Sequence, residues 1–262
     1  MPTSALHVAR TGLEAQDSRM RVIANNLANI GTTGFKRDRA NFATLAYQNE
    51  RIAGQPSSNE TAYATGLNLG TGVAVQSTSS ITTQGTLNVT SNGLDLALDG
   101  DGYFQVQLPG GKLGYTRAGN FTRSAEGQLV TAQGYPVQPA IAIPEGASSV
   151  TIAQDGTVSV VAEGGSAPTE IGQITVASFA NPAGLQALGD NFLAETGASG
   201  AAQIGAGGEG GRGSIRQGML ESSNVNVVEE LVDMIECQRA YEINSKMISA
   251  VDEMLKNANQ TL

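Results

Sequence analysis

The sequence predicts an α+β protein that is mainly β, in which the N- and C-terminal helices pair as a coiled coil. Three observations carry this prediction. Both ends repeat apolar residues every seven positions, the middle alternates short apolar runs with turns, and a polar stretch lies between the first helix and the strands. We therefore expect a terminal helical domain from 1–45 and 222–262, an extended arm at 46–72, and a central antiparallel all-β domain at 73–221.

The N-terminal helix is predicted by alternating steps of three and four between apolar residues, with Gln16 as one polar break. A helix from about Ser4, as N-cap, to Asn29 fits this pattern, and Gly31 supplies the C-terminal stop. The series is Leu6, Ala9, Leu13, Gln16, Met20, Ile23, Leu27 and Ile30.

The C-terminal helix, expected over 224–258, carries the same repeat, with Asn244 as a polar step inside it. The series is Val227, Glu230, Met234, Cys237, Tyr241, Asn244, Ile248, Val251, Leu255, Ala258 and Leu262. A second apolar stripe beside it comprises Val228, Val232, Ile235, Ile243, Met247, Ala250 and Met254. One partner helix would not cover both, so the helix needs several neighbours. Pairing within one monomer as a simple stalk stays an equal alternative to assembly between subunits.

Between the helices the chain is first polar and then rich in short strands. Asn, Ser, Thr and Gly predominate from Tyr47 to Gly72, which predicts an extended arm or a long loop. The alternation at Leu94–Leu98, the turn Asp99–Gly102 and the run Tyr103–Leu108 together predict a β-hairpin. Further strands are expected at 73–75, 87–89, 128–131, 135–143, 149–153, 157–161 and 171–179, a spacing typical of antiparallel sheets, a barrel or a sandwich.

Composition excludes several classes of function. The net charge of -9 over 262 residues argues against nucleic acid as a partner, because phosphate binding needs a basic surface. The single cysteine, Cys237, excludes an internal disulfide, and its helix position favours burial. No stretch is long and apolar enough for a membrane span, and the N-terminus lacks the features of a signal peptide. We expect a chain that is cytosolic or exported uncleaved.

Candidate catalytic and metal sites are weak. His7 has no second imidazole and no carboxylate at i+4, so a surface or packing role is favoured over metal binding. Asp99 and Asp101 fit a hairpin turn better than a calcium loop, because the spaced oxygens and the closing Glu of an EF-hand are missing. The glycine run 207–213 lacks the strand and helix that frame a phosphate site. We therefore expect no enzyme activity, no catalytic residue, no cofactor and no metal.

Residues 24–36, ANNLANIGTTGFK, resemble the N-terminal signature of bacterial flagellar rod and hook proteins. Here asparagines and glycines cap the helix and turn the chain, while Leu27, Ile30 and Phe35 hold the turn to its neighbours. At the other end, LESSNV at 220–225 and the run 228–235 resemble the C-terminal signature of that family. The middle also follows the family pattern at 100–106 and 115–121, with a departure at Ser124 and Ala125 that alters a hairpin.

Within the family, three features favour the distal rod type over hook and proximal rod types. QRAYEINSK at 238–246 followed by DEML at 252–255 resembles the distal rod ending. The arm sits where distal rod proteins have an extra stretch, thought to stiffen the rod, that hook proteins lack. The length suits one sheet domain, whereas hook proteins usually carry another.

The resemblance implies a structural subunit that assembles into a helical tube, transmits motor torque to the hook and encloses the export channel. Implied partners are further copies, proximal rod and hook proteins, the surrounding basal-body rings and the flagellar export apparatus, without nucleic acid or membrane insertion. The implied location is the basal-body rod crossing the periplasm, after type III export without a cleaved signal peptide. The implied signature and subunit-interface residues are Asn25, Asn26, Leu27, Asn29, Gly31, Gly34, Phe35, Glu221, Ser223, Asn224, Val225, Glu229, Glu230, Met234, Gln238, Tyr241 and Asn244.

Three alternatives stay open at this point. The first is a proximal rod or hook subunit of the same apparatus, whose last helix should lack the match at 238–246. The second is a secreted enzyme or binding module with a coiled-coil stalk, which would need a convergent polar site. The third is a surface adhesin, whose stalk would tolerate truncation at either end.

Overall fold

A computed structural model describes residues 2–56, 63–162 and 167–260. The chain divides into two compact units. The helical unit comprises residues up to 27, 38–79 and those from 226 onward, and the β unit comprises 28–37 and 80–225. The structure is mainly β, with a helix near each end of the chain and antiparallel sheets between them.

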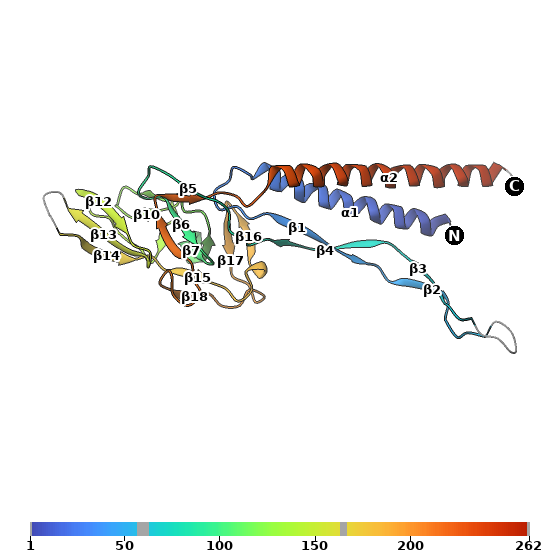
Figure 1. The fold of residues 1–262 in the computed structure, drawn as a ribbon, viewed down its shortest axis with the longest axis horizontal. Helices are drawn as coiled ribbons and strands as arrows, with labels where there is room; N and C mark the ends of the chain where they lie inside the picture. Colours follow the sequence, from blue (N-terminus) through green and yellow to red (C-terminus); the bar gives the residue numbers. More distant parts are fainter. Residues whose placement is uncertain (1, 57–62, 163–166, 261–262) are drawn as a thin grey trace. The chain divides into compact units, whose positions relative to one another are not determined.

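The helical unit contains α1 (Pro2–Ala28) and α2 (Val227–Gln260), which lie side by side (Figure 1). Both form where the apolar heptads predict helices, and α2 begins with Glu229 and Glu230 in its first turn, where carboxylates favour the helix dipole. At 34 residues, α2 is about 51 Å long. Ala9, Ala15, Ile23 and Cys237 are buried in this unit.

The rest of the helical unit is a two-stranded ribbon followed by a hairpin. The strands are β1 (Asp38–Thr44), β2 (Tyr47–Arg51), β3 (Leu67–Gly70) and β4 (Val73–Ser80). β1 pairs with β4, and β2 pairs antiparallel with β3. The stretch predicted as an arm or long loop thus contains a β-hairpin, where Arg51 stacks 4.1 Å from the centroid of the Tyr63 ring.

The β unit is built from short antiparallel strands. They are β5 (Leu87–Val89), β6 (Leu96–Asp99), β7 (Tyr103–Gln107), β8 (Leu113–Thr116), β9 (Thr122–Arg123), β10 (Leu129–Val130), β11 (Val137–Gln138), β12 (Ala147–Ile152), β13 (Thr157–Ala162), β14 (Thr169–Gln173), β15 (Val176–Ser178), β16 (Gln186–Gly189), β17 (Phe192–Ala194), β18 (Gln203–Gly205), β19 (Ser214–Gln217) and β20 (Met219–Glu221). Short 3₁₀ turns, η1 and η2, lie at Pro109–Gly111 and Pro182–Gly184.

The largest sheet has the strand order β16-β17-β8-β7-β15-β18, with β11 also paired to β7. Alternate residues of β7 enter different clusters, as strand geometry requires. Phe104 and Val106 pack in the main core, where the Phe104 ring meets Phe121 edge-to-face at 5.2 Å. Tyr103 faces a smaller cluster with Phe179 on the other side. Both faces of β7 are therefore covered.

The predicted hairpin across Asp99–Gly102 is wrong. The turn exists, but β6 pairs with β19 and β7 pairs with β8, β11 and β15. Gly100 lies so close to Gly213 that an added Cβ would sit 2.9 Å from the Gly213 Cα. Gly100 thus allows the backbone at Gly213 to approach the turn closely, and the turn does not join two strands that pair with each other. The strand predicted over 171–179 is also two strands, β14 and β15.

Candidate assembly interface

The helical unit places Asn26 between three groups. Its side-chain amide accepts a hydrogen bond from the Asp38 backbone N–H at 2.9 Å and donates to the Asp38 carbonyl oxygen at 2.9 Å. The same Nδ2 also donates to Glu230 Oε2 over 3.2 Å. Asn26 and Glu230 are each 1% exposed, so this polar contact is withdrawn from water. One side chain from the predicted signature thus connects α1, the start of β1 and the first turn of α2.

Polar contacts also join the two helices further along. Arg19 Nη2 pairs with Asp233 Oδ1 at 2.9 Å, and the Cys237 thiol donates to the Gln16 carbonyl at 3.1 Å. Burial raises the pKa of that thiol. Asn244 lies beside Gly12, where an added Cβ would be 3.0 Å from Asn244 Nδ2. Two residues of the predicted seam, Cys237 and Asn244, therefore lie on the face of α2 that contacts α1, whereas the seam residues Val227 and Tyr241 are exposed.

The second apolar stripe of α2 is exposed in the single chain. Val228, Ile243 and Met254 are 69%, 61% and 62% exposed. The other members of the stripe, Val232, Ile235, Met247 and Ala250, are exposed as well. Because each helical residue advances about 100°, the stripe lies roughly 160° around α2 from the face that contacts α1. The stripe is therefore on the far side of the helix, and the expectation that it lies beside the seam is wrong.

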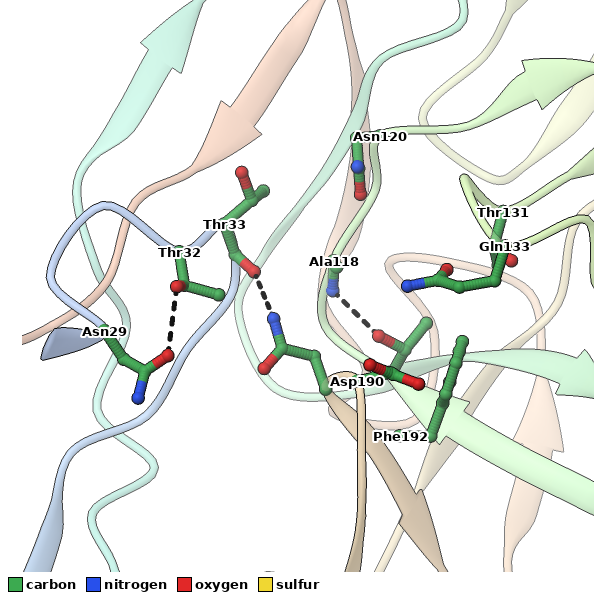
Figure 2. Close-up of a pocket in the computed structure, with 11 residues that line it drawn as sticks. Asn29, Thr32, Thr33, Ala118, Asn120, Thr131, Gln133, Asp190 and Phe192 are labelled. Carbon is green, nitrogen blue, oxygen red and sulfur yellow. Dashed lines mark hydrogen bonds between the residues drawn. The ribbon is translucent and has the colours of Figure 1, made fainter. Parts of the chain in front are cut away.

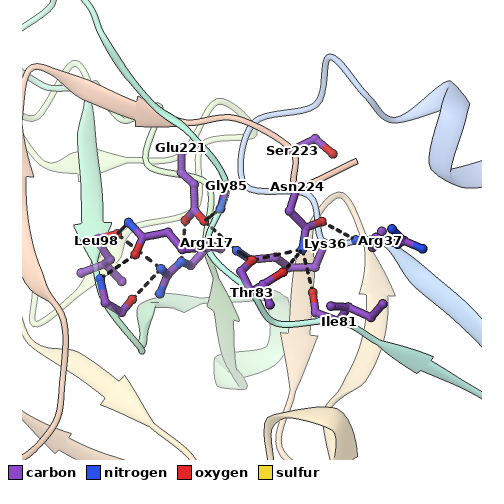
Figure 3. Close-up of polar contacts among 12 residues, drawn as sticks. Lys36, Arg37, Ile81, Thr83, Gly85, Leu98, Arg117, Glu221, Ser223 and Asn224 are labelled. Carbon is purple, nitrogen blue, oxygen red and sulfur yellow. Dashed lines mark hydrogen bonds and ion pairs between the residues drawn. The ribbon is translucent and has the colours of Figure 1, made fainter. Parts of the chain in front are cut away.

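In the β unit, Glu221 lies at the centre of a buried ionic cluster (Figure 3). Arg117 Nε and Lys36 Nζ each approach one of its carboxylate oxygens at 2.6 Å. The Gly85 backbone N–H donates to the same carboxylate at 2.8 Å. The side chain of Glu221 is completely covered, and those of Arg117 and Lys36 nearly so.

These neighbours control the protonation of the cluster. Burial alone would raise the pKa of Glu221, but the charge of Arg117 and the hydrogen bonds from Lys36 and Gly85 outweigh burial and hold that pKa below its usual value. Burial lowers the pKa of Lys36, against the opposing pull of Glu221. Arg117 also donates to the carbonyl oxygens of Gly102 and Gly100, each at 2.6 Å. Hydrogen bonds and ion pairs thus hold both charged groups, the Glu221 carboxylate and the Arg117 guanidinium, in place.

Two further signature residues tie the same segments through backbone contacts. The Gly34 N–H donates to the Glu221 carbonyl oxygen at 2.8 Å, and Gly34 has a φ of +70°. Asn224 accepts from the Arg37 N–H at 2.8 Å and donates to the carbonyls of Ile81 and Thr83 at 2.8 and 3.0 Å. Figure 3 shows Asn224 reaching both neighbouring segments. Within the β unit, the turn after α1 is held to the segment that precedes α2.

The other predicted signature residues are placed unevenly. Val225 is buried, and the partly buried ones are Leu27, Asn29, Phe35, Ser223, Met234 and Asn244. The exposed ones are Asn25, Gly31, Glu229, Gln238 and Tyr241. Sequence reasoning did not single out Lys36 or Arg117 as site residues, although both lie inside segments that resemble the family pattern. Glu221 is 185 positions from Lys36 and 104 positions from Arg117, and a single sequence gives no signal that residues so far apart form ion pairs.

Metal sites and membrane-spanning helices are not found in the part of the chain that the structure describes. Among residues 2–56, 63–162 and 167–260, no group of three or more His, Cys, Asp or Glu side chains is arranged to hold a metal ion. Asp99 pairs with Arg216 at 3.0 Å on the surface. Over the same residues, neither helix is long and apolar enough to cross a membrane.

Three family models match successive parts of the chain. The model of the flagella basal body rod protein matches residues 6–36. The model of the flagellar hook protein FlgE/F/G D1 domain matches residues 97–160. The model of the flagellar basal body rod FlgEFG protein C-terminal region matches residues 216–261. These matches cover both helices and much of the β unit.

Curated relatives match nearly the whole chain. The flagellar basal-body rod protein FlgG of Buchnera aphidicola from Acyrthosiphon pisum is 50% identical over 256 residues, covering 98% of each chain. FlgG of Caulobacter vibrioides is 48% identical, with the same coverage. The rod protein FlgF of Escherichia coli is 34% identical over 273 residues and also covers 98% of each chain. The chain therefore belongs to the FlgG family of flagellar basal-body rod proteins, which are structural subunits of the distal rod in the flagellar basal body and not enzymes.

Proposed function

We propose that the chain assembles through its terminal helices into the wall of a helical tube, which transmits motor torque to the hook and encloses the export channel. The exposed stripe of α2 is the observation that carries this proposal. The helix shows one apolar face to α1 and another on its far side, headed by Val228, Ile243 and Met254. A helix that is apolar on opposite sides is stabilised when neighbours cover both.

The energetic argument favours neighbouring copies as the cover. Fully burying one Val, Ile or Met side chain contributes roughly 1.5–3 kcal/mol. Ordering a long helix costs conformational entropy, so a single chain gains less from α2 than an assembly does. In the assembly, α1 and α2 act as a coiled coil, and the polar steps Gln16 and Asn244 fix its register. The domain boundaries at 45, 72 and 221 separate this inner part from the arm and from an outer β domain.

The signature residues support the same proposal in two ways. Asn26 and Glu230 hold the start of α2 to α1 and β1 within the helical unit, and Gly34, Glu221 and Asn224 hold together, within the β unit, the segments that follow α1 and precede α2. The exposed signature residues, which include Gln238 and Tyr241, are available to contact other subunits. We therefore assign a positioning role to the first group and contacts between subunits to the exposed group.

Membership of the family supports a wider proposal about partners and location. The proposed partners are further copies of this chain, the proximal rod and hook proteins, the rings around the basal body and the flagellar export apparatus. The rod would cross the periplasm, and the chain would reach it without cleavage of a signal peptide. The arm would bridge adjacent subunits and make the rod a stiff shaft.

The first test is genetic. Deleting the gene and imaging isolated basal bodies by electron microscopy should reveal rods that stop short of the outer envelope without a hook, with the restored gene as control. A complete rod that lacks only the hook would point to the hook alternative. Intact flagella would overturn the proposal.

The second test addresses the stripe itself. Ile243→Ser with Met247→Ser should abolish complete rods, because two exposed apolar side chains of the stripe become polar. Glu242→Ser with Lys246→Ser changes exposed residues of the same two turns and serves as the matched control. Equal numbers of complete rods in the two double variants would show that rod assembly does not need the stripe.

A further inference from the structure

A polar cleft of about 420 Å³ opens in the β unit. Its walls come from the turn after α1, from β8 and the segment that follows it, from the turn after β10, and from the hairpin of β16 and β17 (Figure 2). The Asn191 side-chain amide donates to the Thr33 carbonyl at 3.1 Å and so joins the hairpin to the turn. Two segments that resemble the family pattern, 24–36 and 115–121, therefore contribute to one cleft.

Three side chains line the cleft without a hydrogen bond or ion pair from the described residues. They are Asn120, Gln133 and Asp190, which come from three separate segments, and all three are exposed. Figure 2 shows them around the same space, while the bonds that it draws involve other lining residues. Together they offer one carboxylate and two side-chain amides to an incoming group.

The charge of the lining selects the chemistry of that group. Asp190 is the only ionisable residue among the eleven residues that line the cleft, and the lining contains no Lys, Arg or His. A phosphate or carboxylate would therefore meet a negative charge without a cation. A metal ion would find a single carboxylate. A cationic group with several N–H donors fits best, because it can pair with the carboxylate and donate to the amide oxygens.

The same unit carries basic side chains without partners. Among its described residues, Lys112 and Arg123 are exposed and their side chains take part in no ion pair or hydrogen bond, whereas Arg117, Arg212 and Arg216 are engaged. Neither Lys112 nor Arg123 lines the cleft. A guanidinium presents five donors in a planar fork, which suits a carboxylate flanked by two amides better than an ammonium does.

We propose that Arg123 of a second copy of this chain enters the cleft and pairs with Asp190. This inference rests on the proposed assembly between copies. Each chain has a net charge of -9, so copies repel one another, and contacts between opposite charges then decide which orientation is tolerated. The pair would be heterologous, because the cleft and Arg123 are different patches, and such contacts build open helical assemblies.

The turn that carries Asp190 is suited to hold its carboxylate in place. Asp190 and Asn191 have φ values of +51° and +62°, the left-handed conformation of a two-residue hairpin turn. Asn and Asp tolerate this conformation better than other side chains do. Asp190→Asn therefore removes the charge and keeps the turn, which makes it the conservative variant for a test.

The test is a charge swap in the full chain, expressed in cells that lack the chromosomal gene. We expect Asp190→Arg and Arg123→Asp each to reduce the number of complete rods by at least about tenfold, because each places like charges together. The double swap should restore rods to near the wild-type number. Asp190→Arg with Lys112→Asp is the matched control and should not restore them.

A double-mutant cycle with uncharged substitutions tests the same pair if a charge-reversal variant fails to fold. Asp190→Asn and Arg123→Gln should each weaken rods against salt, and the double variant should be no weaker than either single variant. Three results would overturn the assignment and leave the proposed function intact. They are a wild-type number of rods in both charge-reversal variants, additive effects of Asp190→Asn and Arg123→Gln, or restoration of rods in Asp190→Arg by Lys112→Asp. If the wild-type gene itself restores no rods, the proposed function fails instead.

Discussion

Arg117 and Glu221 are 104 positions apart in sequence and form a buried ion pair, with 2.6 Å between Arg117 Nε and Glu221 Oε2. Lys36 contacts the other carboxylate oxygen, also at 2.6 Å. The pair thus joins the end of β20 to the segment after β8, and Lys36 adds the chain that follows α1. Three distant parts of the β unit depend on one carboxylate.

Removing the guanidinium should therefore destabilise the β unit strongly. We expect Arg117→Met to lower the free energy of unfolding by about 3–5 kcal/mol, because it leaves the charge of Glu221 buried with one partner fewer. Denaturant unfolding of the full chain measures this. Arg123→Met, at an exposed arginine, should stay within about 0.5 kcal/mol of the wild type. Similar losses in the two variants would contradict the buried role of Arg117.

The same cluster predicts how stability depends on pH. The pKa of Glu221 is lower in the folded chain than in the unfolded chain, so its contribution is fully present above the ordinary pKa of a glutamate. It is lost as pH falls through the lowered folded-state pKa, because the unfolded chain binds the proton more readily. Unfolding free energies measured below pH 4.5 should fall more steeply for the wild type than for Glu221→Gln. Parallel curves would refute the linkage.

Gly34 should not tolerate a side chain. Its φ of +70° disfavours other residues, and an added Cβ would lie 2.7 Å from the backbone N of Ala118. We expect Gly34→Ala to cost at least about 1 kcal/mol, from backbone strain together with this clash. Gly31→Ala is the matched control, because an added Cβ there meets nothing within 4 Å. Thermal unfolding compares the two, and equal transition temperatures would exclude the clash.

The two helices could be predicted from the sequence because their signal is local. Heptad spacing and caps predict α1 and α2 within a few residues of their observed ends. The excess of apolar residues on α2 likewise predicts that α1 alone does not cover it, and Val228 and Ile243 are exposed as expected. The expected position of that stripe, beside the seam, is wrong, because residues next to each other in the sequence lie about 100° apart around a helix.

Strand partners and the ionic cluster could not be predicted in the same way. The glycines of Asp99–Gly102 predict a turn, but the partner of β6 is β19, more than a hundred residues later. Glu221 and Arg117 each stand in a segment that resembles the family pattern, yet no local spacing relates them. Such pairings are decided by the packing of the whole sheet, which one sequence does not display.

Asn26 provides a test of how the helices are positioned. Asn26→Ala removes both hydrogen bonds to Asp38 and the one to Glu230, at a cost of about 1–3 kcal/mol, because these hydrogen bonds are made away from water. Hydrogen exchange in the first turn of α2 should become faster. Asn25→Ala, at the exposed neighbouring position, should alter it less. Equal exchange in both variants would show that Asn26 does not hold this turn.

The arm offers a test of rod stiffness. Its β2–β3 hairpin exposes Tyr47, Ile52 and Leu69, which gives neighbouring subunits apolar side chains and unpaired strand edges to contact. Deleting residues 50 to 66 removes the last two residues of β2, Ile52 and the chain that connects β2 to β3, and it leaves both helices and the β unit intact. We expect complete but bendable rods, because the helices still assemble while the bridges between subunits are lost. Electron microscopy measures rod curvature, with the restored wild-type gene as control, and straight rods would show that the arm does not stiffen the assembly.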